Sequence, residues 1–408
     1  MAPIPDSTAA RTGSAALLLF GVLLVATNFR APITAIGPVL EQVRAAFALG
    51  TAQAGLLTTL PLLAFAVVSP FAAALARRFG LERTLFGALV VIAAGIALRS
   101  APAVACLYLG TALVGAGIAV GNVLLPGLVK RDHPDDIARV TVVYSMTMGL
   151  VAALASMLAV PLAKTSGGWP LALGAMIVLP LASAVAWIPH LRRHARPAPD
   201  APAAPREGRV WSSALAWHVT LFLGLNSFVY YVVVSWLPAI LAERGYAATA
   251  AGNLHGLLQL ATSVVGLLLL PLVRRLDDQR PLAAGVALLT CAGLAGLCVA
   301  PGAAVLWVAL IGLGAGATFI LALSFVGLRS ARASQAAALS GMAQCVGYLL
   351  AATGPTLAGA LHDAAGGWNA VLALCATASL VTAVFGVLAA RRRTLDDAPL
   401  CLRPAIAD

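Results

Sequence analysis

The first apolar stretch of the chain, residues 14–40, reads SAALLLFGVLLVATNFRAPITAIGPVL and contains one charged residue, Arg30. As a helix with a rise of about 1.5 Å per residue, it is longer than the roughly 30 Å hydrocarbon core of a bilayer. The run is continuous, whereas the strands of a membrane β-barrel alternate apolar and polar residues. The stretch therefore predicts a membrane-spanning α-helix.

The composition of the whole chain agrees with this interpretation. Its 408 residues are 61% hydrophobic and 10% charged, with a mean hydropathy of +0.95, whereas soluble proteins carry about 25% charged residues. These values exclude a water-soluble enzyme. The net charge of +11 does not indicate a nucleic-acid partner, because such binding needs a basic face on a soluble domain, and the apolar runs leave no room for one.

The apolar runs predict an all-α membrane protein with twelve transmembrane helices in two six-helix, pseudo-symmetric halves. The even number of spans places both termini on one side of the membrane. The expected spans are 14–40, 52–76, 81–99, 103–127, 139–163, 169–190, 212–242, 248–273, 281–299, 303–327, 333–361 and 367–390.

Basic residues predict the orientation of these spans, because cytoplasmic loops carry an excess of Lys and Arg. Of the 26 basic residues, 21 fall in the N-terminal segment, the even-numbered loops or the C-terminal tail. Arg30 lies within the first span, and the odd-numbered loops hold only four: Arg44, Arg99, Lys164 and Arg244. We therefore expect a multi-pass protein of a bacterial-type inner membrane with both termini in the cytoplasm.

The domain organisation follows from one long connection. Residues 191–211 are rich in Pro and Ala, and they predict a cytoplasmic linker between an N-terminal bundle, 1–190, and a C-terminal bundle with a short tail, 212–408. We expect its basic residues to serve topology and contacts with anionic lipids.

The two halves also repeat short motifs at an offset of 197 to 199 residues: Arg77-Arg78 with Arg274-Arg275, Gly115-Ala116-Gly117 with Gly314-Ala315-Gly316, and Gly167-Gly168-Trp169 with Gly366-Gly367-Trp368. Parallel repeats of this kind build a midplane cavity in many secondary transporters.

The motif Asn28-Phe29-Arg30-Ala31-Pro32, continuing through Thr34, Gly37 and Pro38, resembles the signature of the cyanate and 2-nitroimidazole transporter family, within the major facilitator superfamily. The resemblance to the superfamily covers nearly the whole chain, and the resemblance to the narrower family implies secondary transport of cyanate or a similar small anion. One position departs from the superfamily pattern. Leu75-Ala76 is followed by Arg77 instead of an aspartate, so the usual pairings of this gating loop do not transfer to Arg77.

Arg30 is the principal candidate for the binding site. An arginine at this depth costs about 2.5–3.5 kcal/mol on insertion scales, so it needs a wet cavity and a partner. All 15 acidic residues fall in loops, tails or span ends, which leaves a mobile anion as the expected counter-charge. The alternative is that Arg30 bonds to unwound backbone near Pro32 and Pro38, or extends towards the interface. For Asn28 the sequence allows two roles: it contacts the substrate, or its side chain bonds to backbone groups of the helix near the proline.

Other polar residues within the spans complete the predicted substrate site. Tyr230 occupies the place of Arg30 in the repeat, since each precedes a proline by eight residues, and Asn226 shares a helix face with it. Of Tyr230 and Tyr231, we expect one to face the cavity and the other to pack. His255 and Gln259 form a second polar face, and His255 either couples protonation to transport or bonds to a neighbouring helix. Gln344 and Tyr348 repeat this spacing, while Asn122 and Tyr144 lie where a cytoplasmic gate is expected.

The sequence predicts neither catalysis nor a cofactor. The six histidines offer no metal-ligand cluster, and no phosphate-binding glycine loop or nucleophile-plus-base arrangement is present. Our leading hypothesis is a monomeric secondary transporter that moves a small anion by alternating access. The alternative is efflux of neutral or aromatic compounds such as nitroimidazoles. From a different class, a non-transporting membrane sensor would need a signalling domain or a long interaction tail, for which the short C-terminal tail offers little.

Overall fold

The computed structural model describes residues 18–133, 136–192, 208–276, 278–331 and 333–397, and the regular elements in these ranges are helices. Ten helical segments are long and apolar enough to cross a membrane, and α12 and α15, with 28 and 33 residues, bring the described set to twelve.

Two of the spans consist of several short elements. The first span comprises residues 18–27, α2 (Ala31–Thr34), η1 (Gly37–Val39) and α3 (Leu40–Phe47), and the sixth comprises α8 (Gly168–Gly174), η2 (Ala175–Ile177), α9 (Val178–Trp187) and η3 (Ile188–Arg192). The remaining elements are α4 (Thr51–Phe79), α5 (Leu81–Arg99), α6 (Val104–Asp132), α7 (Ile137–Ala163), α10 (Gly208–Trp211), α11 (Ala214–Glu243), α12 (Ala248–Arg275), α13 (Arg280–Val299), η4 (Pro301–Ala303), α14 (Ala304–Leu328), α15 (Ala333–Ala365), α16 (Asn369–Ala389) and η5 (Leu395–Asp397).

The first span differs most from its expected form. We expected one span over 14–40, of which 14–17 lie outside the described residues, but the helix is interrupted after residue 27 and continues to Phe47. The interruptions lie beside Pro32 and Pro38, each of which lacks the N–H that would bond one turn back. Arg44 accordingly lies in the last turn of α3 and not in a loop.

Arg99 is a second correction. We expected it in a loop, but it is the last residue of α5 and is fully buried. The linker expected at 191–211 lies outside the described residues over 193–207, and its last four residues form α10.

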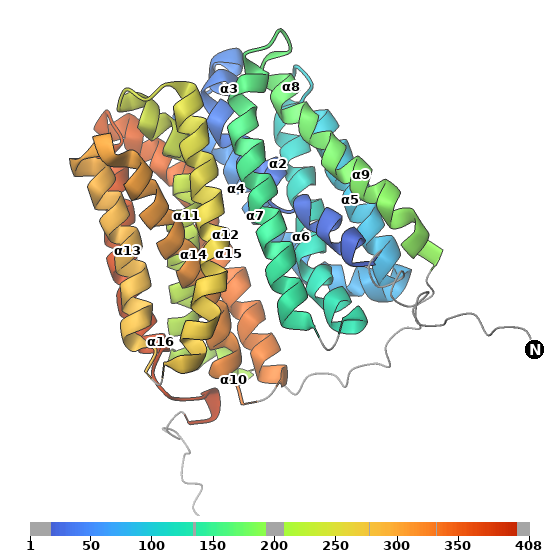
Figure 1. Cartoon of the computed structure of the whole chain (residues 1–408), viewed down its shortest axis with the longest axis vertical. Helices are drawn as coiled ribbons and strands as arrows, with labels where there is room; N and C mark the ends of the chain where they lie inside the picture. The colour runs from blue at the N-terminus through green and yellow to red at the C-terminus, as the bar shows by residue number, and fades with distance from the viewer. Residues whose placement is uncertain (1–17, 134–135, 193–207, 277, 332, 398–408) are drawn as a thin grey trace, which may run out of the picture.

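The helices form two bundles that stand side by side in Figure 1, one from residues 18–192 and one from 208–397. We call the end of the molecule that carries α10 and the C-terminal end of α9 the linker end. The opposite end, which carries residues 48–50 and 164–167, is the distal end. The bundles meet along α4 with α15 and along α7 with α12, so these four helices frame the space between the halves.

The contacts between the halves lie from mid-height to the distal end. Thr59 Oγ1 donates to the Ala352 carbonyl (2.9 Å), and Ser235 Oγ bonds to Thr58 Oγ1 (2.8 Å). Glycines permit this close packing. A Cβ atom on Gly55 would lie 2.7 Å from the Pro355 carbonyl oxygen. In this structure the distal ends of the halves are therefore packed together.

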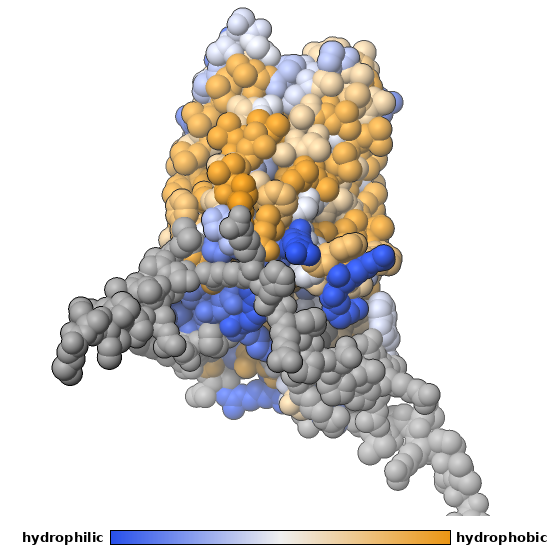
Figure 2. Space-filling model, turned by 90° about the vertical axis from the view of Figure 1, so that its right-hand side faces the viewer, coloured by the Kyte–Doolittle hydropathy of each residue, from blue (hydrophilic) through white to orange (hydrophobic). Residues whose placement is uncertain are grey.

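The surface of the molecule is that of a membrane protein. Figure 2 shows an apolar belt with hydrophilic residues gathered at the linker end below it. Large apolar side chains in the belt are exposed, among them Val67, Phe71 and Val178 at 63%, 61% and 65%. Exposed apolar side chains in such numbers are accommodated by lipid tails rather than by water.

Candidate functional site

The turn in the first span positions Arg30. Residues 28–30 form a turn between the helix of residues 18–27 and α2, and Arg30 is the N-cap residue of α2. The N–H groups of Ile33 and Thr34 both donate to the Arg30 carbonyl, at 3.1 and 3.0 Å. Arg30 is thereby attached to a short rigid turn within the bundle, while its side chain leaves the N-terminal half.

The Arg30 guanidinium reaches across to the C-terminal half. Its Nη1 atom donates to Thr262 Oγ1 (3.2 Å) and Ser263 Oγ (3.3 Å) on α12, and its Cζ atom lies 5.5 Å from the centre of the Tyr230 ring on α11. These contacts are with neutral groups. Among the described residues, no carboxylate forms an ion pair with Arg30, and its side chain does not face lipid.

Tyr230 and Gln259 form the wall beside Arg30. The Tyr230 hydroxyl donates to Gln259 Oε1 (2.8 Å), and Gln259 is fully buried. The Gln259 Nε2 atom is buried and has no hydrogen-bond partner in the part of the chain that the structure describes. A buried amide donor without a partner is costly, so this N–H₂ group is a candidate contact for a ligand oxygen or nitrogen.

Aromatic rings line the same region. Tyr231 packs edge-on against Tyr230, with ring centres 5.3 Å apart, and Tyr348 on α15 packs against Phe65 on α4, at 5.6 Å. Arg30 lies within electrostatic range of both Tyr231 and Tyr348. The structure thus groups a cation with three tyrosines contributed by two helices of the C-terminal half.

Three residues of this group were missing from our predicted site: Thr262, Ser263 and Tyr231. The first two follow Gln259 by three and four positions, so the helical spacing that links His255 to Gln259 also predicts them. The sequence does not decide which of Tyr230 and Tyr231 faces the cavity, because residues adjacent in a helix point about 100° apart.

The two asparagines point elsewhere. Asn28 Nδ2 donates to the carbonyls of Leu24 (3.0 Å) and Val25 (3.2 Å) and to Ser183 Oγ on α9 (2.8 Å). Asn226 Nδ2 donates to the Ala315 carbonyl on α14 (3.1 Å). Both side chains therefore support helices within their own halves, and the structure does not bring them to Arg30.

His255 is also directed away from Arg30. It is fully buried, and its Nε2 atom lies 2.9 Å from the Val234 carbonyl oxygen on α11. A carbonyl only accepts hydrogen bonds, so Nε2 carries the proton. Gly37 of the N-terminal half approaches the same ring. His255 thus lies at the junction of the halves, on the distal side of the group around Arg30.

The remaining predicted residues lie towards the linker end. Gln344 is exposed and donates to Ser340 Oγ (2.8 Å), one turn away on its own helix. Of the predicted gate residues, Asn122 and Arg77 are exposed and Tyr144 is partly buried. The structure does not join these three into one cluster around Arg30.

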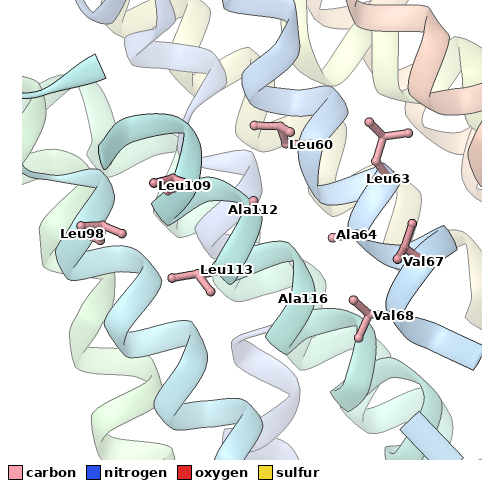
Figure 3. A pocket seen from close by; sticks show the side chains of 10 residues that line it. All are labelled: Leu60, Leu63, Ala64, Val67, Val68, Leu98, Leu109, Ala112, Leu113 and Ala116. Atoms are coloured by element: carbon pink, nitrogen blue, oxygen red, sulfur yellow. The ribbon is translucent and has the colours of Figure 1, made fainter. Parts of the chain in front are cut away.

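An apolar pocket lies apart from this site. Figure 3 shows that α4, α5 and α6 line it with aliphatic side chains only: Leu60, Leu63, Ala64, Val67, Val68, Leu98, Leu109, Ala112, Leu113 and Ala116. Its volume is about 490 Å³. Since Val67 and Leu109 are 63% and 60% exposed, the pocket opens on the membrane-facing surface and offers no polar group to a charged ligand.

Comparison with known proteins adds an independent finding. The model of the Major Facilitator Superfamily matches residues 18–352. The 2-nitroimidazole transporter of Escherichia coli (strain K12) is 52% identical over 379 residues, which cover 93% of this chain and 96% of that protein. The cyanate transport protein CynX of the same organism is 27% identical over 353 residues, 86% and 91% of the two chains. The crystal structure of a D-xylose-proton symporter superposes with a TM-score of 0.73 at 14% identity, covering 93% of this chain and 99% of that one.

Proposed function

Because the chain belongs to the Major Facilitator Superfamily and is a secondary transporter rather than an enzyme, we propose that its cargo is a small planar anion that binds at Arg30. The expected resemblance to the cyanate and 2-nitroimidazole transporters is confirmed by the two relatives. The observation that carries the proposal is the set of Arg30 partners, which are two hydroxyls and a tyrosine ring.

The charge of Arg30 favours an anion. A cation in apolar surroundings is stabilised by an opposite charge, and within the described residues the protein supplies none to Arg30. The planar guanidinium can donate two parallel hydrogen bonds to a carboxylate-like head. Gln259 Nε2, which is buried without a partner, offers a further donor to the same head.

The position of Arg30 between the halves supports alternating access. Arg30 belongs to the N-terminal half and bonds to Thr262 and Ser263 of the C-terminal half. A ligand that takes over the guanidinium replaces these neutral contacts with stronger, charge-assisted ones. Binding would therefore change the interaction between the two halves, which is what a rocking transporter requires.

A second candidate cargo is a neutral nitroaromatic compound. It is favoured by the 52% identity to a 2-nitroimidazole transporter and by the rings of Tyr230, Tyr231 and Tyr348 around Arg30. A nitro group presents two planar oxygens, as a carboxylate does, and the tyrosine rings stack against the heterocycle. The two candidates share their geometry and differ in charge.

Uptake by proteoliposomes tests the proposal, with labelled benzoate, cyanate and 2-nitroimidazole as probes. Replacing the guanidinium removes charge-assisted hydrogen bonds worth about 1.5–3 kcal/mol each, so Arg30→Gln and Arg30→Ala should lower kcat/KM for anion uptake by about 10- to 100-fold. Arg30→Lys should also fail, since it lacks the planar fork. Arg44→Gln is the matched control. Arg44 is a partly buried arginine at the distal end that pairs with Glu41.

The outcomes separate the two candidates. Loss of anion uptake in all three Arg30 variants, with Arg44→Gln unchanged, supports the anion. Transport of 2-nitroimidazole that persists in Arg30→Gln, without anion uptake by the unmodified protein, supports the nitroaromatic compound. Anion uptake that persists in Arg30→Ala contradicts the proposal.

A further inference from the structure

We infer that Arg99 is a positioning residue: it holds open the break in the first span and thereby directs Arg30 towards α12. The inference deepens the proposed function, since it rests on Arg30 as the binding group. Arg99 is the last residue of α5, is fully buried, and has no carboxylate partner among the described residues. Burying an arginine without a counter-charge is costly, so the groups that bind its guanidinium must compensate for the lost water.

Both contacts of Arg99 are with backbone carbonyls. Its Nη1 atom donates to the Pro32 carbonyl (2.6 Å), and its Nη2 atom donates to the Leu173 carbonyl (3.5 Å). In a regular helix the Pro32 carbonyl would accept from the N–H of Ile36, but here that N–H bonds to Ile33 (3.2 Å). Arg99, which is fully buried, thus supplies the donor that the broken helix has lost.

The Pro32 carbonyl is an effective point at which to hold Arg30. Pro32 lies two residues after Arg30, in the α2 turn whose first N–H groups bond to the Arg30 carbonyl. At the far end of α2, Thr34 Oγ1 lies 3.4 Å from the Ala152 carbonyl on α7. With α2 held by α5 and α7, the direction of the Arg30 side chain is set by the N-terminal half before any ligand binds.

The second half of the chain provides an internal comparison. At the repeat offset of 199 residues, the counterpart of Arg99 is Cys298, and the counterpart of Pro32 is Tyr231. The equivalent helix α11 runs without a break from Ala214 to Glu243. An arginine, Arg99, therefore lies beside the interrupted first span, whereas a cysteine, Cys298, occupies the corresponding position of the half that contains the continuous helix α11.

Arginine is suited to this role by its shape. Its fork presents several donors in fixed directions, so one side chain reaches carbonyls on two different spans. Leu173 lies near the end of α8, where the helix changes to the 3-10 turn η2. Arg99 thus donates to carbonyls at two places where the backbone leaves the regular α-helix. The ammonium group of a lysine is a point charge and is suited to only one of these carbonyls.

A labelling experiment tests the position of residue 30 without any substrate. In a protein whose native cysteines are replaced by serine or alanine, Arg30→Cys is modified by a negatively charged methanethiosulfonate reagent, and the rate is measured. Adding Arg99→Met should change this rate at least fivefold, because α2 is no longer held. Adding Arg99→Lys should change it less, since lysine keeps the charge and one donor.

Arg244→Met is the matched control. Arg244 also donates to two backbone carbonyls, those of Leu297 (3.3 Å) and Cys298 (3.1 Å), but it lies in the other half and does not touch the first span. It should leave the labelling rate unchanged. Equal rates with and without Arg99→Met overturn the inference. If Arg99→Met does not fold, Arg99→Gln replaces it, and equal rates with and without Arg99→Gln overturn the inference in the same way.

A double-mutant cycle separates positioning from general support of the fold. With benzoate and 2-nitroimidazole as probes, Arg99→Lys should raise the KM of uptake when Arg30 is present and should have no further effect beside Arg30→Ala. Additive losses would contradict the inference. If Arg30→Ala leaves uptake of both probes unchanged, the proposed function fails, while the labelling rates still decide the role of Arg99.

Discussion

Arg30 and Asn28 lie two residues apart and serve opposite halves of the structure. Asn28 turns back to the carbonyls of Leu24 and Val25 and to Ser183, while Arg30 crosses to Thr262 and Ser263. The turn at residues 28–30 makes this divergence possible. In apolar surroundings a polar group needs a partner. The Asn28 N–H₂ group finds its partners within the N-terminal half, whereas the Arg30 guanidinium finds its partners across the space between the halves.

The ion pair of Glu82 and Arg131 joins a buried carboxylate to a guanidinium whose side chain is 34% exposed. Glu82 on α5 is 4% exposed and accepts from Arg131 on α6 at 2.7 Å. Arg131→Met should lower the free energy of unfolding by about 1–3 kcal/mol, because it leaves the buried Glu82 carboxylate without this donor, while solvent already screens the pair on its Arg131 side. Thermal unfolding of the detergent-solubilised protein measures the loss.

The second half of the chain supplies the control for this prediction. At nearly the same repeat offset, Gln279 accepts from Arg329 at 2.8 Å, so a neutral amide serves where Glu82 stands in the first half. We therefore expect Glu82→Gln to be clearly less destabilising than Arg131→Met. Equal unfolding temperatures for the two variants would contradict this account.

At the scale of elements, small residues decide how closely the two halves approach. A Cβ atom on Gly55 of α4 would lie 2.7 Å from the Pro355 carbonyl oxygen of α15, and one on Gly359 would lie 2.8 Å from the Thr51 carbonyl oxygen. On the other side, a Cβ atom on Gly256 of α12 would lie 3.0 Å from the Ala153 carbonyl oxygen of α7. Backbone approaches of this kind are typical of packed membrane helices.

Gly55→Leu should therefore prevent distal closure and lower the uptake rate at least about tenfold, a change of about 1.4 kcal/mol in the barrier. The measurement is initial uptake in proteoliposomes at equal amounts of reconstituted protein. Gly87→Leu on α5 and Gly285→Leu on α13 are matched controls, because nothing lies within 4 Å of the added Cβ at either position. If Gly55→Leu transports as well as the two controls, the close packing of α4 and α15 is not required for transport.

At the scale of the molecule, the two bundles are packed together at the distal end and along the level of Arg30. Besides the Arg30 contacts, hydroxyl groups form hydrogen bonds between the halves: Thr58 with Ser235, and Thr59 with Ala352 and Thr356. These bonds are uncharged and individually weak, at about 0.5–1.5 kcal/mol each. An interface built in this way can open and close at modest cost, as alternating access requires.

A cross-link at the distal end tests this interpretation. The hydroxyl oxygens of Thr59 and Thr356 are 3.1 Å apart, which suits Thr59→Cys and Thr356→Cys to disulfide formation. In a background without native cysteines, oxidation of the double variant should abolish uptake and reduction should restore it. Each single variant should transport under both conditions. Unchanged uptake in the fully cross-linked protein would show that the distal end need not open.

The distribution of basic residues predicts which end of the molecule faces the cytoplasm. Since basic residues gather at the linker end, we expect that end and both termini to face the cytoplasm. In intact cells an impermeant maleimide should therefore label Ala303→Cys, an exposed distal position, and should label Arg280→Cys, an exposed linker-end position, only after permeabilisation. The opposite pattern would reverse the proposed topology.

The fold class and the span count could be predicted from the sequence, because a bilayer imposes a length and an apolar composition on each helix. Arg30 could be singled out in the same way, since a charge inside an apolar run is costly whatever surrounds it. The interruption of the first span was only suggested by Pro32 and Pro38, and the burial of Arg99 was missed, because a residue at the end of a span is equally consistent with a loop.

Only the tertiary structure decided which polar residues meet. Thr262, Ser263 and Tyr230 come to Arg30 from two hundred or more residues along the chain. Asn28, Asn226 and His255, equally polar in sequence, bond instead to nearby backbone or adjacent helices. The physical reason is that periodicity determines which residues share a face of one helix, whereas the packing of the two halves determines which faces oppose each other.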